Sequence, residues 1–353
     1  MRSLPDSLIV RERDPLNAET RLGILASGIT PAHDFYIRSH LPLPSPATPS
    51  WRLVVEGVVE KRLVLSLDEL RRLPIRTVTM TMECAGNGRA SLLRKVEGVP
   101  WAYGAAGTAE FTGVPLPRLL ERARVGAAAV EIIFAGEDRG EVEPGKEAAF
   151  ERSLPMEAAQ NEDVLVAWAM NGEALAPDHG FPLRLVVPGW YGMASVKWLT
   201  RISASRTPFA GYYQMQRYVY TGEPGLADGT PVTRTRVRSL ITSPADGATL
   251  DGSTVEITGT AWSGEGPVRR VEVSTDGGEA WTEAHLQPTA HAYAATTWRL
   301  AWSPQSPGPH TLVARATDGS GKTQPLEPVW NVYGYGNNAV QRVQVAVVDR
   351  PTG

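Results

Sequence analysis

The chain has one cysteine, and it lies in a glycine-rich loop, the stretch from Met82 to Arg89 that reads MECAGNGR. Most unpaired cysteines are small hydrophobic packing residues. Cys84 is followed by Gly86 and Gly88, however, and glycine lets a backbone approach another group closely. Arg89 would favour the thiolate if it lies nearby. The stretch therefore suits a nucleophile or a soft-metal ligand, and packing remains the simpler alternative.

Positive and hydrogen-bonding side chains gather in three other motifs. FYIRSHLP carries Arg38 and His40, which point to the same side of an extended segment. DHGFPLRLVVPG carries His179 and Arg184, and SVKW carries Lys197. Such donors fit a phosphate or another anion, although most surface arginines need no ligand.

Short strands and a few short helices must position these motifs. Residues 51–56 and 62–65 read as two strands, and a Ser66-x-x-Glu69 capping box starts a helix that ends at Pro74. Apolar and polar residues alternate over 78–82, which predicts a strand leading into the cysteine loop. The helices are too few and too short for a Rossmann fold, so the first part is a mixed α+β domain. Residues 1 to about 50, with four prolines near their end, are predicted to be an irregular lead-in.

The character of the chain changes between residues 221 and 243, a segment rich in Gly, Pro and Thr. Only short strands with turns follow, at the spacing of an immunoglobulin-like β-sandwich. We therefore predict two domains, 1–230 and 231–353. Three arginines alternate in the connecting segment, and we expect them to face solvent: Arg234, Arg236 and Arg238.

Composition narrows the classes of protein. Of 353 residues, 42% are hydrophobic and 21% charged, and the net charge is -3, which fits a globular protein and not a general nucleic-acid binder. One cysteine excludes an internal disulfide and a cysteine-only zinc or iron–sulfur site. No signal peptide or membrane span is visible, so we expect a cytoplasmic protein, or a periplasmic one if the chain is a trimmed mature form.

Taken in order, the four motifs resemble the sulfite oxidase family of molybdenum–molybdopterin enzymes, of the cytochrome-free bacterial type. The resemblance covers nearly the whole chain, including AWSGEGPVRRVEVSTDGGEAW and PVWNVYGYGNN near its end. It implies an α+β fold, with a mixed α/β molybdopterin-binding domain followed by an immunoglobulin-like dimerisation domain. It also implies one molybdopterin per chain and a homodimer.

The resemblance also implies a role for each matching residue. Cys84 is expected to be the thiolate ligand of molybdenum. Arg38 and Arg89 are expected to hold an anionic substrate, with Phe150 beside them. The expected cofactor-binding residues are Tyr36, Ile37, Arg38, Ser39, His40, Cys84, Asp138, His179, Arg184, Ser195, Val196 and Lys197.

Two positions depart from the pattern of the sulfite-oxidising members. Phe150 stands where a tyrosine is expected, which keeps the ring but removes the O–H donor. A second-domain arginine is expected after Ser263-Gly264, but Glu265 and Pro267 occupy that turn, and Arg269 or Arg270 follows late. An acidic side chain there would oppose a sulfite dianion.

The predicted function is two-electron oxygen-atom transfer on a small oxyanion such as sulfite. No haem motif is present, so electrons would pass to a separate partner such as a cytochrome. The alternatives are a non-sulfite substrate such as a sulfoxide, a thiol hydrolase or transferase with Cys84 as nucleophile and His179 as base, and a non-catalytic binding module.

Overall fold

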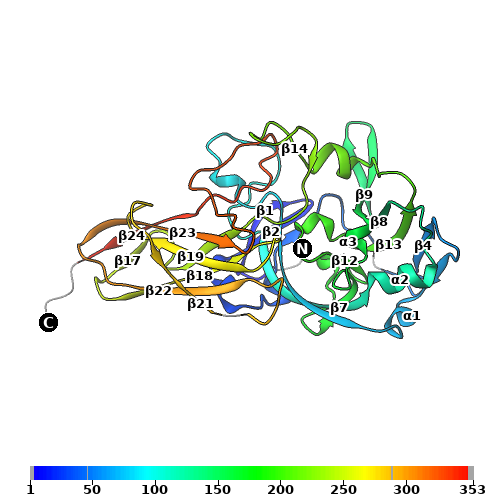
Figure 1. Cartoon of the computed structure of the whole chain (residues 1–353), viewed down its shortest axis with the longest axis horizontal. Helices are drawn as coiled ribbons and strands as arrows, with labels where there is room; N and C mark the ends of the chain where they lie inside the picture. Colours follow the sequence, from blue (N-terminus) through cyan, green and yellow to red (C-terminus); the bar gives the residue numbers. More distant parts are fainter. Residues whose placement is uncertain (1–3, 46, 288, 349–353) are drawn as a thin grey trace.

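The computed structural model of the chain describes residues 4–45, 47–287 and 289–348. Two parts lie side by side along the long axis in Figure 1. The larger part holds most strands of the first 220 residues, and the narrower part is a β-sandwich from the last third of the chain.

Two five-stranded sheets organise the larger part. One has the order β11 (Glu173–Ala174), β10 (Leu165–Met170), β7 (Ala106–Pro115) and β6 (Arg76–Glu83), and β12 (Arg184–Val186) also pairs with β10. The other has the order β5 (Leu63–Leu65), β4 (Leu53–Gly57), β13 (Leu199–Ser205), β8 (Glu131–Glu143) and β9 (Lys146–Pro155). The α-helices are short: α1 (Leu67–Arg71), α2 (Leu116–Ala123) and α3 (Met156–Ala159). Within the described ranges, no helix is both long and apolar enough to cross a membrane.

Several local predictions are confirmed. The Ser66 side chain accepts a hydrogen bond from the Glu69 backbone N–H, and the Glu69 carboxylate accepts one from the Ser66 backbone, so the capping box forms at the start of α1. The alternating segment around Val78 is the strand β6, which delivers the chain to Cys84.

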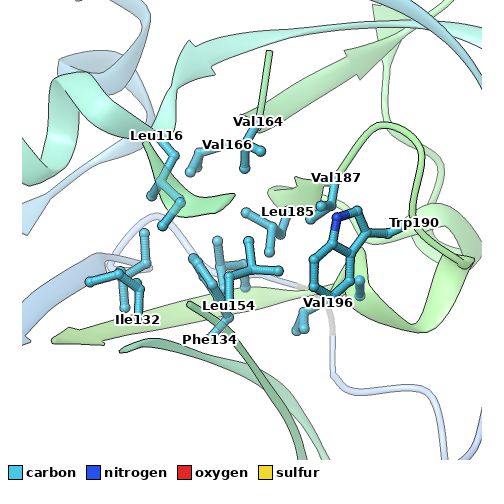
Figure 2. Packing of buried hydrophobic residues seen from close by; sticks show 14 of the residues in the cluster. Leu116, Ile132, Phe134, Leu154, Val164, Val166, Leu185, Val187, Trp190 and Val196 are labelled. Atoms are coloured by element: carbon cyan, nitrogen blue, oxygen red, sulfur yellow. The ribbon is translucent and has the colours of Figure 1, made fainter. Parts of the chain in front are cut away.

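The core of the larger part fills the space between these sheets and α2. Leu116, Phe134, Val166, Leu185 and Val196 are almost fully buried there and point toward one another (Figure 2). Burial of this apolar surface stabilises the scaffold on which the loops at the strand ends are held.

The prediction of an irregular lead-in is wrong for much of residues 1–50. Three strands, β1 (Leu8–Arg13), β2 (Leu16–Thr20) and β3 (Ile37–Arg38), form a separate antiparallel sheet. Alternation of apolar residues in this segment buries Leu8, Ala18 and Ile37 in a small core of their own. The prolines that suggested an irregular segment come after β3, so they do not interrupt it.

The last third of the chain is the predicted immunoglobulin-like sandwich. Its four-stranded sheet is β16 (Arg238–Ser243), β18 (Val255–Trp262), β22 (Thr296–Trp302) and β21 (His285–Leu286). Its five-stranded sheet is β17 (Ala248–Leu250), β24 (Arg342–Val347), β23 (Gly308–Asp318), β19 (Val268–Ser274) and β20 (Thr282–Glu283). Apolar side chains such as Val271, Trp298 and Leu312 hold the two sheets together without a disulfide.

The connecting segment between the two parts is more ordered than predicted. It contains a small sheet of β14 (Val219–Tyr220) and β15 (Thr230–Pro231). Arg234 is exposed as expected, but Arg238 is 1% exposed and Arg236 forms an ion pair with Glu223, so the expectation of solvent exposure is wrong for Arg236 and Arg238. They lie between the two parts of the chain, where buried carboxylates pair with them.

Candidate active site

Cys84 comes directly after β6 and opens a loop at the junction of the two parts of the chain. Its backbone N–H donates to Ala105, and its carbonyl accepts from Asn87, which closes a tight turn. The side chain is 6% exposed and lines two neighbouring cavities. The thiol therefore lies at a shared wall, accessible to whatever occupies either cavity.

The larger cavity brings together most of the residues that the motifs predict. Gly192 also lines it, and a Cβ atom there would lie 2.6 Å from the Tyr36 hydroxyl oxygen, so only glycine allows this approach. The lining residues from the predicted set are Tyr36, Arg38, Ser39, His40, Cys84, Asp138, Phe150, His179, Arg184, Ser195 and Lys197.

Buried positive charge dominates the walls of this cavity. Arg184 is 4% exposed, and its guanidinium donates to the carbonyl oxygens of His179 (3.1 Å) and Ser195 (3.2 Å). Arg38 likewise donates to the side-chain oxygen of Asn17. These partners are neutral, so the guanidinium charges remain available to a bound anion. Burial lowers the pKa of Arg184 to about 10, which still leaves it charged at neutral pH.

Lys197 is held at the opposite side by neutral partners as well. Its ammonium donates to the Asp178 carbonyl at 2.8 Å and lies 4.1 Å from the centre of the Trp198 ring. Trp198 has a φ of 48°, an uncommon conformation for a bulky residue, and its indole N–H donates to Pro177. Burial, followed by the charge of Arg184, lowers the pKa of Lys197 to about 7. An anion in the cavity would raise it again.

Asp138 contributes the one buried carboxylate among the predicted residues. It is 4% exposed, and its Oδ1 atom has no hydrogen-bond partner among the described residues. Burial raises its pKa to about 7, against the opposing attraction of Lys197. A buried polar atom without a partner marks a place where a bound group would supply one.

The Asp138→Asn variant should therefore stabilise the cofactor-free protein more at pH 8 than at pH 5. Because the folded-state pKa is raised above 3.8, the folding free energy from this group is lost as pH rises toward about 7. Asparagine removes that dependence, and the gain should be about 2 kcal/mol larger at pH 8. Urea unfolding at both pH values measures it, with the exposed neighbour Glu137→Gln as control. Equal gains at the two pH values would contradict the raised pKa.

The smaller cavity adjoins Cys84 on the side of the second domain. It shares Arg38, His40, Cys84 and Tyr218 with the larger cavity, and its other lining residues are Arg89, Glu97, Gly98, Tyr213, Arg217, Tyr333 and Tyr335. The Arg89 guanidinium donates to the Tyr333 carbonyl at 2.8 Å and lies 5.0 Å from the Tyr335 ring centre. Three arginines and an aromatic wall thus surround a space suited to a compact anion.

His40 and Tyr218 meet where the two cavities join. His40 Nε2 and the Tyr218 hydroxyl form a short hydrogen bond. Burial and the nearby charge of Arg38 lower the pKa of His40 well below its usual value, so the imidazole is neutral. Burial raises the pKa of Tyr218, so its phenol keeps its proton. The Phe150 ring stacks on His40, with 4.7 Å between ring centres.

Some predicted site residues lie elsewhere. The side chains of Ile37 and Val196 are buried in hydrophobic cores and do not line the larger cavity. The Arg270 guanidinium forms an ion pair with Glu272. Glu265 pairs with Lys322 at 3.6 Å, so its carboxylate is already compensated by a cation. The second domain instead contributes Tyr333 and Tyr335.

Besides Glu97 and Gly98, five aromatic or basic residues of the smaller cavity were missed from the sequence: Tyr213, Arg217, Tyr218, Tyr333 and Tyr335. They come from the π-helical turn Tyr213–Arg217, the residue after it, and the segment 333–335. Each is an ordinary aromatic or basic residue in its local sequence. Tyr333 and Tyr335 lie in a turn with Gly334 at a φ of 59°, and their ring centres are 5.5 Å apart.

Comparisons with known proteins cover both parts of the chain. Residues 40–213 match the family model of the oxidoreductase molybdopterin binding domain, and residues 230–348 match that of the Mo-co oxidoreductase dimerisation domain.

Individual relatives extend over nearly the whole chain. Mitochondrial sulfite oxidase of Mus musculus is 37% identical over 366 residues, which cover 97% of this chain and 66% of the mouse protein. Sulfite oxidase of Arabidopsis thaliana is 34% identical, with 96% and 93% covered. The crystal structure of the sulfane dehydrogenase SoxCD from Paracoccus pantotrophus superposes with a TM-score of 0.84 at 30% identity, covering 97% of this chain and 87% of that one. The chain thus spans just under two thirds of the length of the mouse relative and nearly all of the plant one.

Proposed function

Because this chain belongs to the sulfite oxidase family of molybdopterin-binding oxidoreductases, we propose that it transfers an oxygen atom to or from a small oxyanion such as sulfite, with two electrons moving in the opposite direction. The observation that carries this proposal is the buried group of cations around a single cysteine. Arg38, Arg184 and Lys197 share the larger cavity with Cys84, and their hydrogen bonds to described residues end on neutral atoms.

The residues of the larger cavity fit a molybdopterin. Arg184 and Lys197 would bind its phosphate, and the unpartnered Asp138 Oδ1 would accept from an N–H group of the pterin. Cys84 would be the protein's ligand to molybdenum, since thiolates suit soft metals. The bound cofactor would supply two-electron redox chemistry that side chains cannot carry out.

The smaller cavity would bind the substrate. Arg38 and Arg89 would hold the negative charges of the oxyanion next to Cys84, whereas Arg217 of the same cavity is paired with Glu97 at 3.9 Å. For sulfite, the net reaction converts sulfite and water into sulfate, two protons and two electrons. The neutral His40 and the protonated Tyr218 would orient the anion and accept or return a proton, a role that Phe150 cannot perform.

Two partners belong to this proposal. The electrons would pass to a separate acceptor protein such as a cytochrome. The match of residues 230–348 to a dimerisation domain supports a homodimer built through the sandwich.

The alternative substrate is another sulfur compound, such as a sulfane or a sulfoxide. The absence of a hydroxyl at residue 150 and the likeness to a sulfane dehydrogenase favour it. The hydrolase alternative is less well supported. His179 Nε2 lies 3.0 Å from the Ala32 carbonyl oxygen and donates to it, so only the Nδ1 atom of this ring could act as a base for Cys84.

Metal and pterin analysis tests the proposal. Protein purified from a host that makes molybdopterin should contain about one molybdenum per chain and release a fluorescent pterin on oxidation. It should oxidise sulfite with a dye acceptor, and a panel of sulfite, sulfane and sulfoxide compounds ranks the substrates. Protein without molybdenum or pterin, and without turnover of any panel compound, would refute it.

A further inference from the structure

The loop that carries Cys84 is bonded along its length to the second domain. The loop residues that make these bonds are Glu83, Ala85, Asn87, Gly88, Arg89 and Ser91. Their partners are residues 238, 262, 333, 336 and 337, which lie within the segment matched by the dimerisation model. Apart from Cys84 itself, only Gly86 and Ala90 of the loop 83–91 have no such bond among the described contacts.

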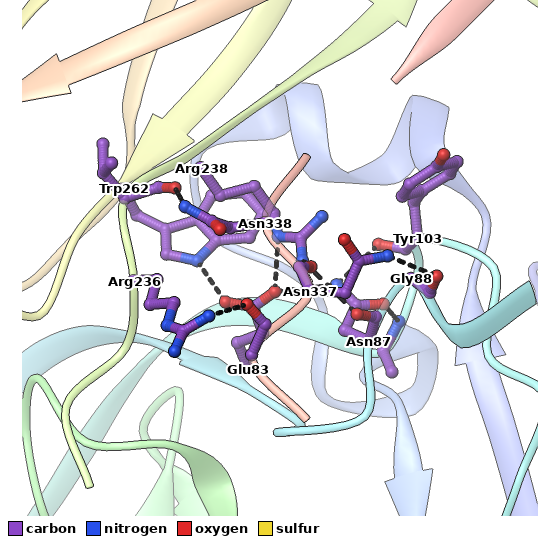
Figure 3. A network of polar contacts seen from close by, with 12 residues as sticks. Glu83, Asn87, Gly88, Tyr103, Arg236, Arg238, Trp262, Asn337 and Asn338 are labelled. Carbon is purple, nitrogen blue, oxygen red and sulfur yellow. Dashed lines mark hydrogen bonds and ion pairs between the residues drawn. The ribbon is translucent and has the colours of Figure 1, made fainter. Parts of the chain in front are cut away.

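Glu83, the residue before the cysteine, is clamped by two side chains of the sandwich (Figure 3). The guanidinium of Arg238 lies 2.6 Å from its carboxylate, and both side chains are 1% exposed. The Trp262 indole N–H donates to the other carboxylate oxygen at 2.9 Å. A buried ion pair of this kind is strongly disrupted when one charge is removed, because the other is left uncompensated.

The residues after the cysteine are fixed through their backbone. The Gly336 N–H donates to the Ala85 carbonyl at 2.8 Å, and the Asn337 side-chain amide donates to the Gly88 carbonyl at 2.9 Å. Gly88 has a φ of 87°, and a Cβ atom there would lie 3.2 Å from Asn337. The glycine therefore permits both the turn and the close approach of the second domain.

We infer that Glu83, Arg238, Trp262 and Asn337 are positioning residues that aim the Cys84 thiolate. A loop with two glycines has many accessible conformations, and fixing it costs conformational entropy. The hydrogen bonds and the ion pair on either side of Cys84 offset this entropy cost when the protein folds, so the loop is ordered before a ligand binds. The second domain thus fixes the conformation of the loop that carries Cys84, in addition to matching a dimerisation domain. The inference rests on the proposed function only for the identity of what Cys84 binds.

The chain's one cysteine allows a direct test in full-length, cofactor-free protein. Iodoacetamide reacts with thiols much faster than with other side chains, so the adduct on Cys84, located by mass spectrometry of peptides, reports the exposure of this thiol. Glu83→Gln and Arg238→Gln should each speed alkylation about tenfold, because each leaves a buried charge that loosens the loop. The double variant should return to within about threefold of wild type, because two amides can hydrogen-bond without a buried charge.

The control breaks a different ion pair, one within the segment that connects the two parts of the chain. Glu223 pairs with Arg236 and does not bond to residues 83–91 among the described contacts. Glu223→Gln should leave the alkylation rate within about threefold of wild type, even if it lowers the melting temperature. If a charge variant fails to fold, Trp262→Phe keeps an aromatic side chain and removes one donor to Glu83, and should still speed alkylation.

Three results would overturn the inference: single variants that fold but react at the wild-type rate, a double variant as fast as the singles, or a Glu223→Gln variant as fast as Glu83→Gln. A second measurement is the pterin content of purified holoenzyme, which should fall in the singles and recover in the double. Alkylation decides the positioning role even if the protein proves to hold no molybdenum.

Discussion

Cys84→Ser should lower turnover by at least about a thousandfold. Mutation of a residue that only hydrogen-bonds a metal ligand lowers activity or metal affinity about 10- to 100-fold, and loss of the ligand itself should cost more. Serine has nearly the size of cysteine and fits the same turn, but its hydroxyl does not ionise at neutral pH. The cations that would hold the pterin are untouched, so the variant should retain part of its pterin while losing molybdenum. Steady-state turnover, molybdenum content and pterin content separate these effects.

The matched control for Cys84→Ser is Met193→Leu. Met193 lines the same cavity and is buried to the same extent, and its replacement conserves volume. Its activity should stay within about threefold of wild type. A Cys84→Ser enzyme that keeps full activity would exclude a metal-ligand role, and the buried thiol would then be a packing residue.

Tyr218→Phe should lower kcat/KM about 100-fold at unchanged cofactor content, within the range for loss of a positioned acid–base group. The aromatic ring remains, so its stacking on Tyr335, with 5.0 Å between ring centres, should persist. Only the hydroxyl that hydrogen-bonds His40 is lost. Tyr213→Phe is the control, because its ring contacts His40 and Phe150 edge-on or tilted, with no described hydrogen bond to His40. That control should change kcat/KM less than about threefold.

Phe150→Tyr in the Tyr218→Phe background tests whether a phenol hydroxyl next to His40 restores activity when it comes from residue 150 and not from residue 218. The Phe150 ring stacks on His40, so a phenol at residue 150 would also lie next to the imidazole. Recovery of part of the lost activity is expected. A Tyr218→Phe enzyme with wild-type kcat/KM would show that Tyr218 is part of the cavity wall alone.

The site residues that were predictable from the sequence lie in compact local motifs. Cys84, His179 and Arg184 stand in turns and strand ends whose glycines and prolines mark them, and the structure brings them to one cavity. Strand alternation before Cys84 and the capping box before α1 depend on neighbours a few residues away, which a sequence pattern records directly.

The residues that were missed depend on contacts between distant segments. Tyr218 and Tyr335 stack on each other across more than a hundred residues of chain, and nothing in either local sequence marks the partner. Arg238 has the alternating pattern of an exposed strand, yet it is buried because Glu83 lies opposite it. Register between distant strands and pairing of buried charges are tertiary properties, and local periodicity contains no record of them.

The contact of Arg89 with Tyr333 also has a consequence for the order in which the protein is made. The two residues are 244 positions apart in the chain. At about 5–20 residues per second, the ribosome adds residue 333 roughly 12 to 50 s after residue 89. Throughout that interval the nascent domain lacks the segment that closes one wall of its smaller cavity, and the cysteine loop lacks its partners. The active site can therefore be completed only after residue 333 has been added, long after its cysteine has been synthesised.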